Sequence, residues 1–328
     1  MLGVDLGSYS LKYCLTRKKK EDTFEIVKTG DFILPAEAFA GGEVRKRGEL
    51  TEELKEYWKK ERLPREVCLS FYHPQIVVQN ITIPEMSEAE MENALRWEAG
   101  SIITGEDQFQ VGWEILNRQD GNVEILFSAS PSVAVSGYLE LFQDAGIRIE
   151  AVEPHIICLL KGFLGLHPDL GKQGGFVLVE VGYLKSSILY FEKGRLAFSR
   201  YLTWGLSRVW DHLRDRGNLL PAEIMELIQR GTRFTDVPHQ LEEALSETIP
   251  DLHAEIKRSF TYFQTTFGAE ALANSYLLGG GSRILLLRSG LESSLSITFR
   301  DLKTKITDGG EQFHFELYLA AMGASLWS

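Results

Sequence analysis

The sequence has few cysteines and no long apolar run. Its 328 residues include only 3 cysteines, Cys14, Cys68 and Cys158, which lie far apart and form no CxxC pair. We therefore predict reduced thiols in the core and no disulfide framework. No segment approaches the about 20 consecutive apolar residues that a membrane-spanning helix needs, and the sequence opens on a strand-like segment in place of a secretory signal. These features predict a cytoplasmic protein.

Basic charge is also scarce. The sequence has 46 acidic and 35 basic side chains, which gives a formal net charge of -11. Because contact with a nucleic-acid backbone needs concentrated lysine and arginine, this balance argues against a nucleic-acid partner. The short basic runs at 17–20 and 45–47 lie next to predicted turns, where solvated side chains are expected.

Several catalytic motifs are missing as well. The 7 histidines show no HxxxH or HExxH spacing, which argues against a histidine-based zinc site. The sequence contains no GxSxG motif, the signature of many serine hydrolases. We predict no catalytic residues from these patterns. The 6 tryptophans are expected to pack in the core, with an interaction surface as the alternative.

What the sequence does contain is an internal repeat. Residues 4–7 (VDLG) and 179–182 (VEVG) each precede a strand-like run, at 11–16 in the first copy and at 186–191 in the second. A polar turn and a third strand-like run follow in both copies. Each half of the chain is therefore predicted to open with a β-meander whose first turn carries an acidic residue and a glycine.

The composition of this turn is typical of a phosphate-binding hairpin. Glycine lets the backbone approach an anion closely, and turn amides and hydroxyl groups donate hydrogen bonds to phosphate. A carboxylate repels phosphate, so we expect Asp5 to hold a magnesium ion through water, while Lys12 adds a positive charge. The alternative is a pair of ordinary hairpins with glycine turns. The predicted ligand-binding residues are Asp5, Gly7, Ser8, Ser10 and Lys12 in the first hairpin and Glu180, Gly182, Ser186 and Ser187 in the second.

A glycine-rich loop follows the second hairpin. Residues 276–282 (YLLGGGS) predict a buried strand that runs into a glycine loop and then a helix. Gly279, Gly280, Gly281 and Ser282 would let a ligand lie against bare backbone, whereas a simple tight connection is the alternative reading of a glycine triplet.

These elements, in this order, resemble the actin, Hsp70 and sugar kinase superfamily. The resemblance spans nearly the whole chain and implies an α/β, ribonuclease H-like fold of duplicated lobes that close around ATP and magnesium. It implies that 5–12 form the first phosphate loop, 180–187 the second and 279–282 the adenosine loop. The apolar tail 315–326 is similar to the second connecting helix of that superfamily.

A segment between the two hairpins narrows the choice of family. It begins with two predicted strands, and the sequence 87–90 (SEAE) that follows predicts a capping box at the start of a helix. We interpret it as an α+β module inserted into the first lobe. The expected boundaries are 1–65 and 150–174 with the connecting helix 313–328 for the first lobe, 66–149 for the module and 175–312 for the second lobe.

The module and four sequence stretches are similar to the PilM family of type IV pilus assembly proteins and to its relative FtsA. The stretches are 3–12, 77–84, 146–154 and 254–263. The resemblance implies a nucleotide-binding scaffold at the cytoplasmic face of the inner membrane, which binds the cytoplasmic N-terminal tail of the membrane protein PilN. It places that tail in a groove between the first lobe and the module, and pairing with an exposed strand edge of the module is a hypothesis from chemistry. A homo-oligomer is also compatible with this reading.

Two positions depart from the family pattern. Glu180 stands where the family has aspartate, and Tyr183 where it has a small residue. The longer side chain moves the carboxylate by about 1.5 Å and the tyrosine crowds the turn, so we expect a scaffold with weak or absent ATPase activity. A lysine that often follows the second hairpin is missing, and Arg230 is the candidate substitute.

Two other functions stay open at this point. A sugar-type or other small-molecule kinase would need a catalytic base and a polar substrate pocket, for which the sequence offers no motif. An FtsA-like division or secretion platform protein would normally carry an amphipathic C-terminal helix, and none follows the expected connecting helix in this sequence.

Overall fold

The computed structural model describes the chain except residues 21–22, 36–37, 41, 106–107, 217–218, 221–222, 225, 228–237, 269–271, 303–313 and 328. The described residues form two compact units. Unit 1 comprises 1–168, 195–197 and 318–328, and unit 2 comprises 169–194 and 198–317. Among the helices of these ranges, none combines the length and the apolar character that crossing a membrane requires.

The main sheet of unit 1 has 5 strands in the order β10-β6-β1-β2-β3. The central strand β1 is buried along its whole length, as expected for a strand covered on both faces. It pairs parallel with β6 and antiparallel with β2. The strands are β10 (Arg148–Pro154), β6 (Glu66–Phe71), β1 (Leu2–Leu6), β2 (Ser10–Lys20) and β3 (Thr23–Ile33).

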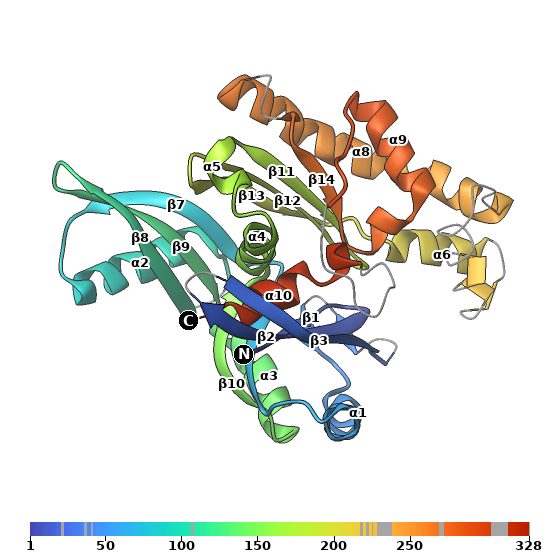
Figure 1. Ribbon diagram of the computed structural model, residues 1–328, viewed down its shortest axis with the longest axis horizontal. Helices are drawn as coiled ribbons and strands as arrows, with labels where there is room; N and C mark the ends of the chain where they lie inside the picture. The colour runs from blue at the N-terminus through green and yellow to red at the C-terminus, as the bar shows by residue number, and fades with distance from the viewer. Residues whose placement is uncertain are drawn as a thin grey trace. The chain divides into compact units, whose positions relative to one another are not determined.

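Helices cover both faces of this sheet (Figure 1). On one face lie α4 (His155–Leu166) and α10 (Leu319–Ser325), and on the other lie α1 (Arg47–Glu61) and α3 (Ser132–Asp144). Side-chain alternation along β1 and β2 sets the two faces. Gly3 faces α10, whereas Tyr13 packs edge-on against Tyr57 of α1. The sheet is therefore the middle layer of a helix, sheet, helix arrangement.

The helices α4 and α10 cross at glycines. An added Cβ at Gly162 of α4 would lie 2.0 Å from the carbonyl oxygen of Leu319, and one at Gly323 of α10 would lie 1.8 Å from that of Cys158. A Cβ at Gly3 of β1 would lie 2.0 Å from the carbonyl oxygen of Ala321. The backbones of both helices and of β1 are thus in direct contact.

The tail 315–326 differs from the single helix expected from the sequence. It forms a 3-10 turn, Phe315–Leu317, followed by the short helix α10. Tyr318 separates them with a non-helical backbone, and its hydroxyl group donates to Oδ1 of Asp31 in β3 at 3.0 Å. The tail is therefore a 3-10 turn and a short helix in place of one continuous helix.

The segment between β6 and α3 forms a separate layer of unit 1. Its 3-stranded antiparallel sheet has the order β7-β9-β8. Helix α2 packs on one face, where Met91 and Leu95 meet Ile125 and Phe127 of β9. The elements are β7 (Val77–Pro84), α2 (Glu88–Ile102), β8 (Phe109–Gln119) and β9 (Asn122–Pro131).

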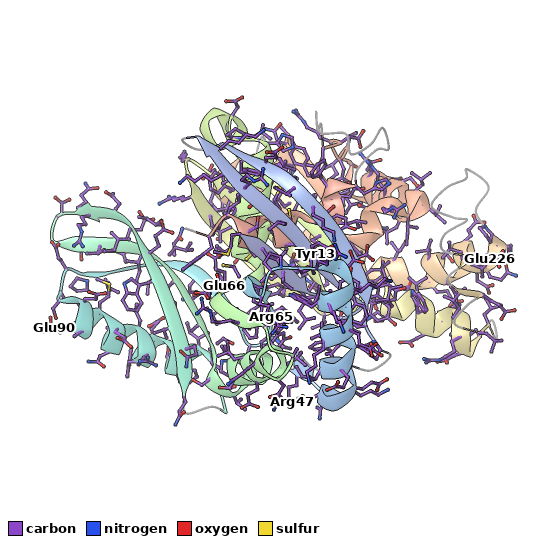
Figure 2. All side chains as sticks on the ribbon, turned by 60° about the horizontal axis from the view of Figure 1, so that its bottom comes forward. Tyr13, Arg47, Arg65, Glu66, Glu90 and Glu226 are labelled. Atoms are coloured by element: carbon purple, nitrogen blue, oxygen red, sulfur yellow. The ribbon has the colours of Figure 1, made fainter. Side chains whose placement is uncertain are left out.

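The capping box predicted for this segment is confirmed. The backbone N–H of Ser87 donates to Oε2 of Glu90 at 2.9 Å, and the backbone N–H of Glu90 donates to the Ser87 hydroxyl group at 3.4 Å. Figure 2 shows Glu90 at the outer end of α2. The turn between β8 and β9 contains Asp120 and Gly121, both with positive φ, which suits a two-residue hairpin turn.

The sheet of unit 2 has 4 strands in the order β13-β12-β11-β14. Helix α8 packs against it through aromatic rings, and Tyr190 of β12 stacks on Phe263 at 5.3 Å between centroids. The strands are β11 (Phe176–Val181), β12 (Ser186–Glu192), β13 (Arg195–Leu202) and β14 (Ser275–Leu278). The helices of this part of the chain are α5 (Leu170–Gln173), α6 (Ser207–Asp215), α8 (His239–Phe267), the 3-10 helix η2 (Gly280–Arg283) and α9 (Leu285–Leu295).

Two short strands of unit 1, β4 (Phe39–Ala40) and β5 (Glu43–Val44), pair only with each other among the described residues.

The two main sheets repeat one topology. In each, a central strand pairs antiparallel with the next strand along the chain and parallel with a later strand. The acidic residues occupy equivalent places, since Asp5 pairs with Lys12 and Glu180 pairs with Ser187 across the first hairpin. The internal repeat of the sequence therefore corresponds to a repeat in structure.

Candidate functional site

The first hairpin brings its predicted residues together within unit 1. Asp5 lies near the end of β1, directly opposite Lys12 of β2. Gly7 opens the turn, where an added Cβ would lie 3.0 Å from the carbonyl oxygen of Ser10. The Lys12 ammonium group donates to the hydroxyl oxygen of Ser10 at 3.0 Å, and Ser8 lies within the same turn. One cation and one carboxylate therefore flank a short glycine turn.

Two residues that the sequence did not single out meet the Asp5 carboxylate. The Ser70 hydroxyl group donates to Oδ1 of Asp5 at 2.8 Å, and Nδ1 of His155 lies 3.0 Å from the same oxygen. Ser70 stands next to Asp5 in the parallel register of β6 and β1, and His155 is the first residue of α4. Neither belongs to a local motif, so only the packing of three separate elements shows the cluster.

The surroundings keep this carboxylate ionised. Burial alone would raise the pKa of Asp5, but the charge and hydrogen bond of His155, the charge of Lys12 and the Ser70 hydroxyl group outweigh it and lower that pKa well below 3.8. The N-terminus of α4 adds a favourable dipole for a negative charge. The first hairpin therefore carries a fixed negative charge at neutral pH.

We predict that acid removes a specific part of the stability through Asp5. The pKa of Asp5 is near 3.8 in the unfolded chain and lower in the folded chain. Its contribution to stability is therefore complete at a pH above the unfolded-state pKa, and it is lost as the pH falls toward the folded-state pKa. The free energy of unfolding, measured with urea between about pH 6 and pH 3, should therefore decline less steeply in Asp5→Asn than in the wild type. The exposed Asp169 provides the control, since Asp169→Asn should follow the wild-type curve. Parallel curves for Asp5→Asn and the wild type would contradict this assignment.

The hydroxyl groups of the second hairpin are used inside unit 2. The Ser187 hydroxyl group donates to Oε2 of Glu180 at 2.8 Å. The fully buried Ser186 donates to the carbonyl oxygen of Trp204 at 2.8 Å. Gly182 closes the turn, since its N–H donates to the carbonyl oxygen of Lys185 at 2.9 Å. Both serine hydroxyl groups are thus used within unit 2.

Two further side chains of this turn have defined places. The ring of Tyr183 packs edge-on against Trp210 of α6, with centroids 5.9 Å apart. The Lys185 ammonium group lies 4.4 Å from the centroid of the Tyr201 ring, a cation–π contact. Lys185 therefore supplies a positive charge at the second hairpin that the sequence did not single out, and Arg230, the expected substitute, lies outside the described residues.

The glycine loop packs on the second hairpin. A Cβ at Gly279, which has φ +74, would lie 2.6 Å from the carbonyl oxygen of Val181, and a Cβ at Gly281 would lie 2.5 Å from the Val181 side chain. Gly280 is exposed and has only an ordinary contact, 3.5 Å from Leu206. The Ser282 hydroxyl group donates to the carbonyl oxygen of Gly279 at 2.7 Å. Gly279 and Gly281 are therefore required by packing, and Gly280 alone offers open backbone.

The donor set fits a hydrated cation better than a cage of protein ligands. The described residues contain no group of three or more histidine, cysteine or acidic side chains that could hold a metal ion. Oδ1 of Asp5 is used by Ser70 and His155, whereas Oδ2 accepts no hydrogen bond from the described residues. The Asp5 side chain keeps 11% of its surface exposed. This fits a magnesium ion that is held through water, the usual preference of that ion.

The repeated sheets with paired carboxylate hairpins define a protein of the actin-like ATPase fold, which confirms the predicted fold class. More specifically, the chain belongs to the PilM family: residues 3–315 match the family model described as "Type IV pilus assembly protein PilM". The predicted family is thereby confirmed, and with it a role in type IV pilus assembly.

Solved structures agree with this fold. A PilM-PilN type IV pilus biogenesis complex matches with a TM-score of 0.82 and 22% identity over 99% of this chain and 97% of that one. The ethanolamine utilization protein EutJ from Carboxydothermus hydrogenoformans has a TM-score of 0.61 and 12% identity over 100% and 89%. MreB 5 of Spiroplasma citri bound to AMPPNP has a TM-score of 0.56 and 8% identity over 98% and 93%. No curated protein matches the sequence significantly.

Proposed function

We propose that this protein is a nucleotide-binding scaffold of type IV pilus assembly. It binds the cytoplasmic N-terminal tail of a PilN-like membrane protein and is held at the inner face of the inner membrane by that partner. The observation that carries the proposal is the pair of equivalent carboxylate hairpins in a chain of the PilM family. The similar solved PilM-PilN complex supports the choice of partner, and a homo-oligomer is compatible with this role.

ATP is the proposed ligand of the two hairpins and the glycine loop. In unit 1 the turn of Gly7, Ser8 and Ser10 with Lys12 would bind phosphate, and Asp5 would hold magnesium through water. In unit 2 the contributing residues are Glu180, Gly182, Gly280 and Lys185. When bound, magnesium would neutralise phosphate charge. The AMPPNP in the similar MreB structure supports a nucleotide ligand.

Hydrolysis is not part of the proposed role. Oε2 of Glu180 already accepts a hydrogen bond from Ser187, so this carboxylate is held within its own hairpin. Positioning of an attacking water depends on sub-ångström placement of such groups. This geometry suits a nucleotide that stays bound in a regulatory or structural role better than one that is hydrolysed rapidly.

An exposed strand of the module supports the peptide-binding part of the proposal. Strand β8 lies at the edge of its sheet, and most of its side chains are partly or fully exposed. An edge strand offers unpaired backbone N–H and C=O groups, with which an extended peptide can pair. We propose the module as the part that contacts the partner tail.

Calorimetric titration tests both halves of the proposed function. We expect the protein to bind ATP with magnesium and, separately, a synthetic peptide of the PilN-like N-terminus, without appreciable ADP production. Asp5→Ala should weaken binding of magnesium ATP by about tenfold or more, while the exposed Asp169→Ala serves as the control. Sugar-dependent ADP production without peptide binding would instead support a small-molecule kinase.

A further inference from the structure

The Asp5 carboxylate is part of a buried cluster of three side chains. Asp5 comes from β1, Ser70 from β6 and His155 from the N-terminus of α4. Their exposed fractions are 7%, 1% and 4%. The distances from Oδ1 of Asp5 are 2.8 Å to the Ser70 hydroxyl oxygen and 3.0 Å to Nδ1 of His155, and these two atoms lie 3.1 Å apart. Buried polar groups in such close contact fix one another's orientation.

The chemistry of the three groups assigns the protons. An ionised carboxylate is only an acceptor, so both the Ser70 hydroxyl group and Nδ1 of His155 must donate to Oδ1. The proton on Nδ1 can also be shared with the Ser70 oxygen, which lies at a similar distance. Both hydrogen bonds therefore end on one oxygen of Asp5, and Oδ2 accepts none from the described residues.

This arrangement differs from a nucleophilic triad. In such a triad the histidine uses one ring nitrogen for the acid and the other for the serine. Here Ser70 and Asp5 face the same nitrogen, Nδ1, and the hydroxyl group donates to the carboxylate. Ser70 is also fully buried. The cluster can orient a carboxylate, but it does not activate a serine.

The equivalent carboxylate of unit 2 meets a neighbour in its own hairpin. Glu180 accepts a hydrogen bond from Ser187, its cross-strand neighbour in the same hairpin. The position equivalent to Ser70 in the parallel register is Leu278, which offers no hydrogen bond from its side chain. The hydrogen bonds of Asp5 thus join three separate elements, whereas the hydrogen bond from Ser187 to Glu180 joins two strands of one hairpin.

We propose that His155 is a positioning residue, which together with Ser70 fixes the Asp5 carboxylate so that Oδ2 is presented to the hydrated magnesium ion of a bound nucleotide. This inference rests on the nucleotide binding proposed above and adds the residue on which its cation dependence relies. Groups that hydrogen-bond a metal-binding carboxylate commonly control metal affinity without touching the ion.

The first test needs no nucleotide. Proton and nitrogen NMR spectra of the full chain with isotope-labelled histidine report which ring nitrogen is protonated, and the signal missing from His155→Asn identifies His155. We expect Nδ1 to carry a proton and its resonance to shift in Asp5→Asn. An unprotonated Nδ1, or a resonance that Asp5→Asn leaves unchanged, would overturn the inference.

The second test measures how strongly magnesium improves ATP binding, as the ratio of Kd in EDTA to Kd with magnesium. We expect His155→Leu to reduce this ratio by about tenfold or more, whereas His155→Asn, whose amide replaces the Nδ1 donor, should retain most of it. His253→Leu is the matched control, because it removes a half-buried imidazole whose Nε2 has no hydrogen-bond partner among the described residues. A wild-type ratio in His155→Leu would overturn the inference.

The failure of the proposed function is distinguishable from that of the inference. If the wild type does not bind ATP with or without magnesium, the proposed nucleotide role fails and the cation-presenting role of His155 fails with it. If the wild type binds ATP, and His155→Asn lowers the ratio of Kd in EDTA to Kd with magnesium as much as His155→Leu does, the nucleotide role stands and the inference alone is overturned. Thermal melting of each variant identifies any that does not fold.

Discussion

Replacing Gly323 with alanine is expected to lower the free energy of unfolding by at least about 3 kcal/mol, at the upper end of overpacking effects. The new methyl group would lie 1.8 Å from the carbonyl oxygen of Cys158, a backbone atom that cannot rotate away. Either α10 or α4 would have to move, although α10 also contacts β1 at Gly3. The substitution therefore disturbs two contacts of the core at once.

The matched control is the same substitution on another helix. Gly137 lies in α3, and an added Cβ there would have no heavy atom within 4 Å. Because alanine favours helix more than glycine does, Gly137→Ala should raise stability by about 0.5 to 1 kcal/mol. Urea denaturation followed by circular dichroism measures both variants. Equal denaturation midpoints for Gly323→Ala and the wild type would mean that the two helices do not cross as closely as described.

Replacing Trp204 with alanine should lower the free energy of unfolding by about 3 to 5 kcal/mol. This side chain is only 2% exposed, and its indole N–H donates to the carbonyl oxygen of Thr248 in α8 at 2.8 Å. Truncation leaves a large cavity and removes the hydrogen bond to α8. The backbone carbonyl of Trp204, which accepts the Ser186 hydroxyl group, is retained in this variant.

Trp97 provides the comparison for Trp204. It is 76% exposed on α2, so Trp97→Ala should change stability by no more than about 0.5 kcal/mol. Chemical denaturation of the two variants, followed by circular dichroism, tests the contrast. A loss in Trp97→Ala as large as in Trp204→Ala would show that α2 packs against further residues.

Local patterns were sufficient for part of this structure. The capping box at Ser87 and Glu90 and the two hairpins depend on residues a few positions apart in the sequence. Such features are predictable because short-range hydrogen bonds and backbone preferences decide them. The repeated hairpins followed from these local elements, and the fold of duplicated lobes from the resemblance that the elements carry.

Long-range packing decided the features that the sequence did not indicate. Ser70 and His155 reach Asp5 only because β6 and α4 lie beside β1, and no spacing in the sequence marks them. The sequence also did not indicate that Val181 fills the space beside Gly279 and Gly281, which leaves no room for a side chain there. Likewise, nothing in composition separates buried Trp204 from exposed Trp97.

The way the chain enters and leaves the module has an evolutionary consequence. Strands β6 and β10 are parallel neighbours, and a parallel pair needs a crossover of about a dozen residues or more, usually a helix. Helix α3, with 13 residues, meets that need without β7, β8, β9 or α2. Among the described residues, β7, β8 and β9 form a sheet of their own, and α2 packs on that sheet in a shared core. These four elements can therefore be exchanged, enlarged or lost along a lineage while the sheet that carries Asp5 stays intact. Under the proposed function, partner choice and nucleotide binding could then diverge separately.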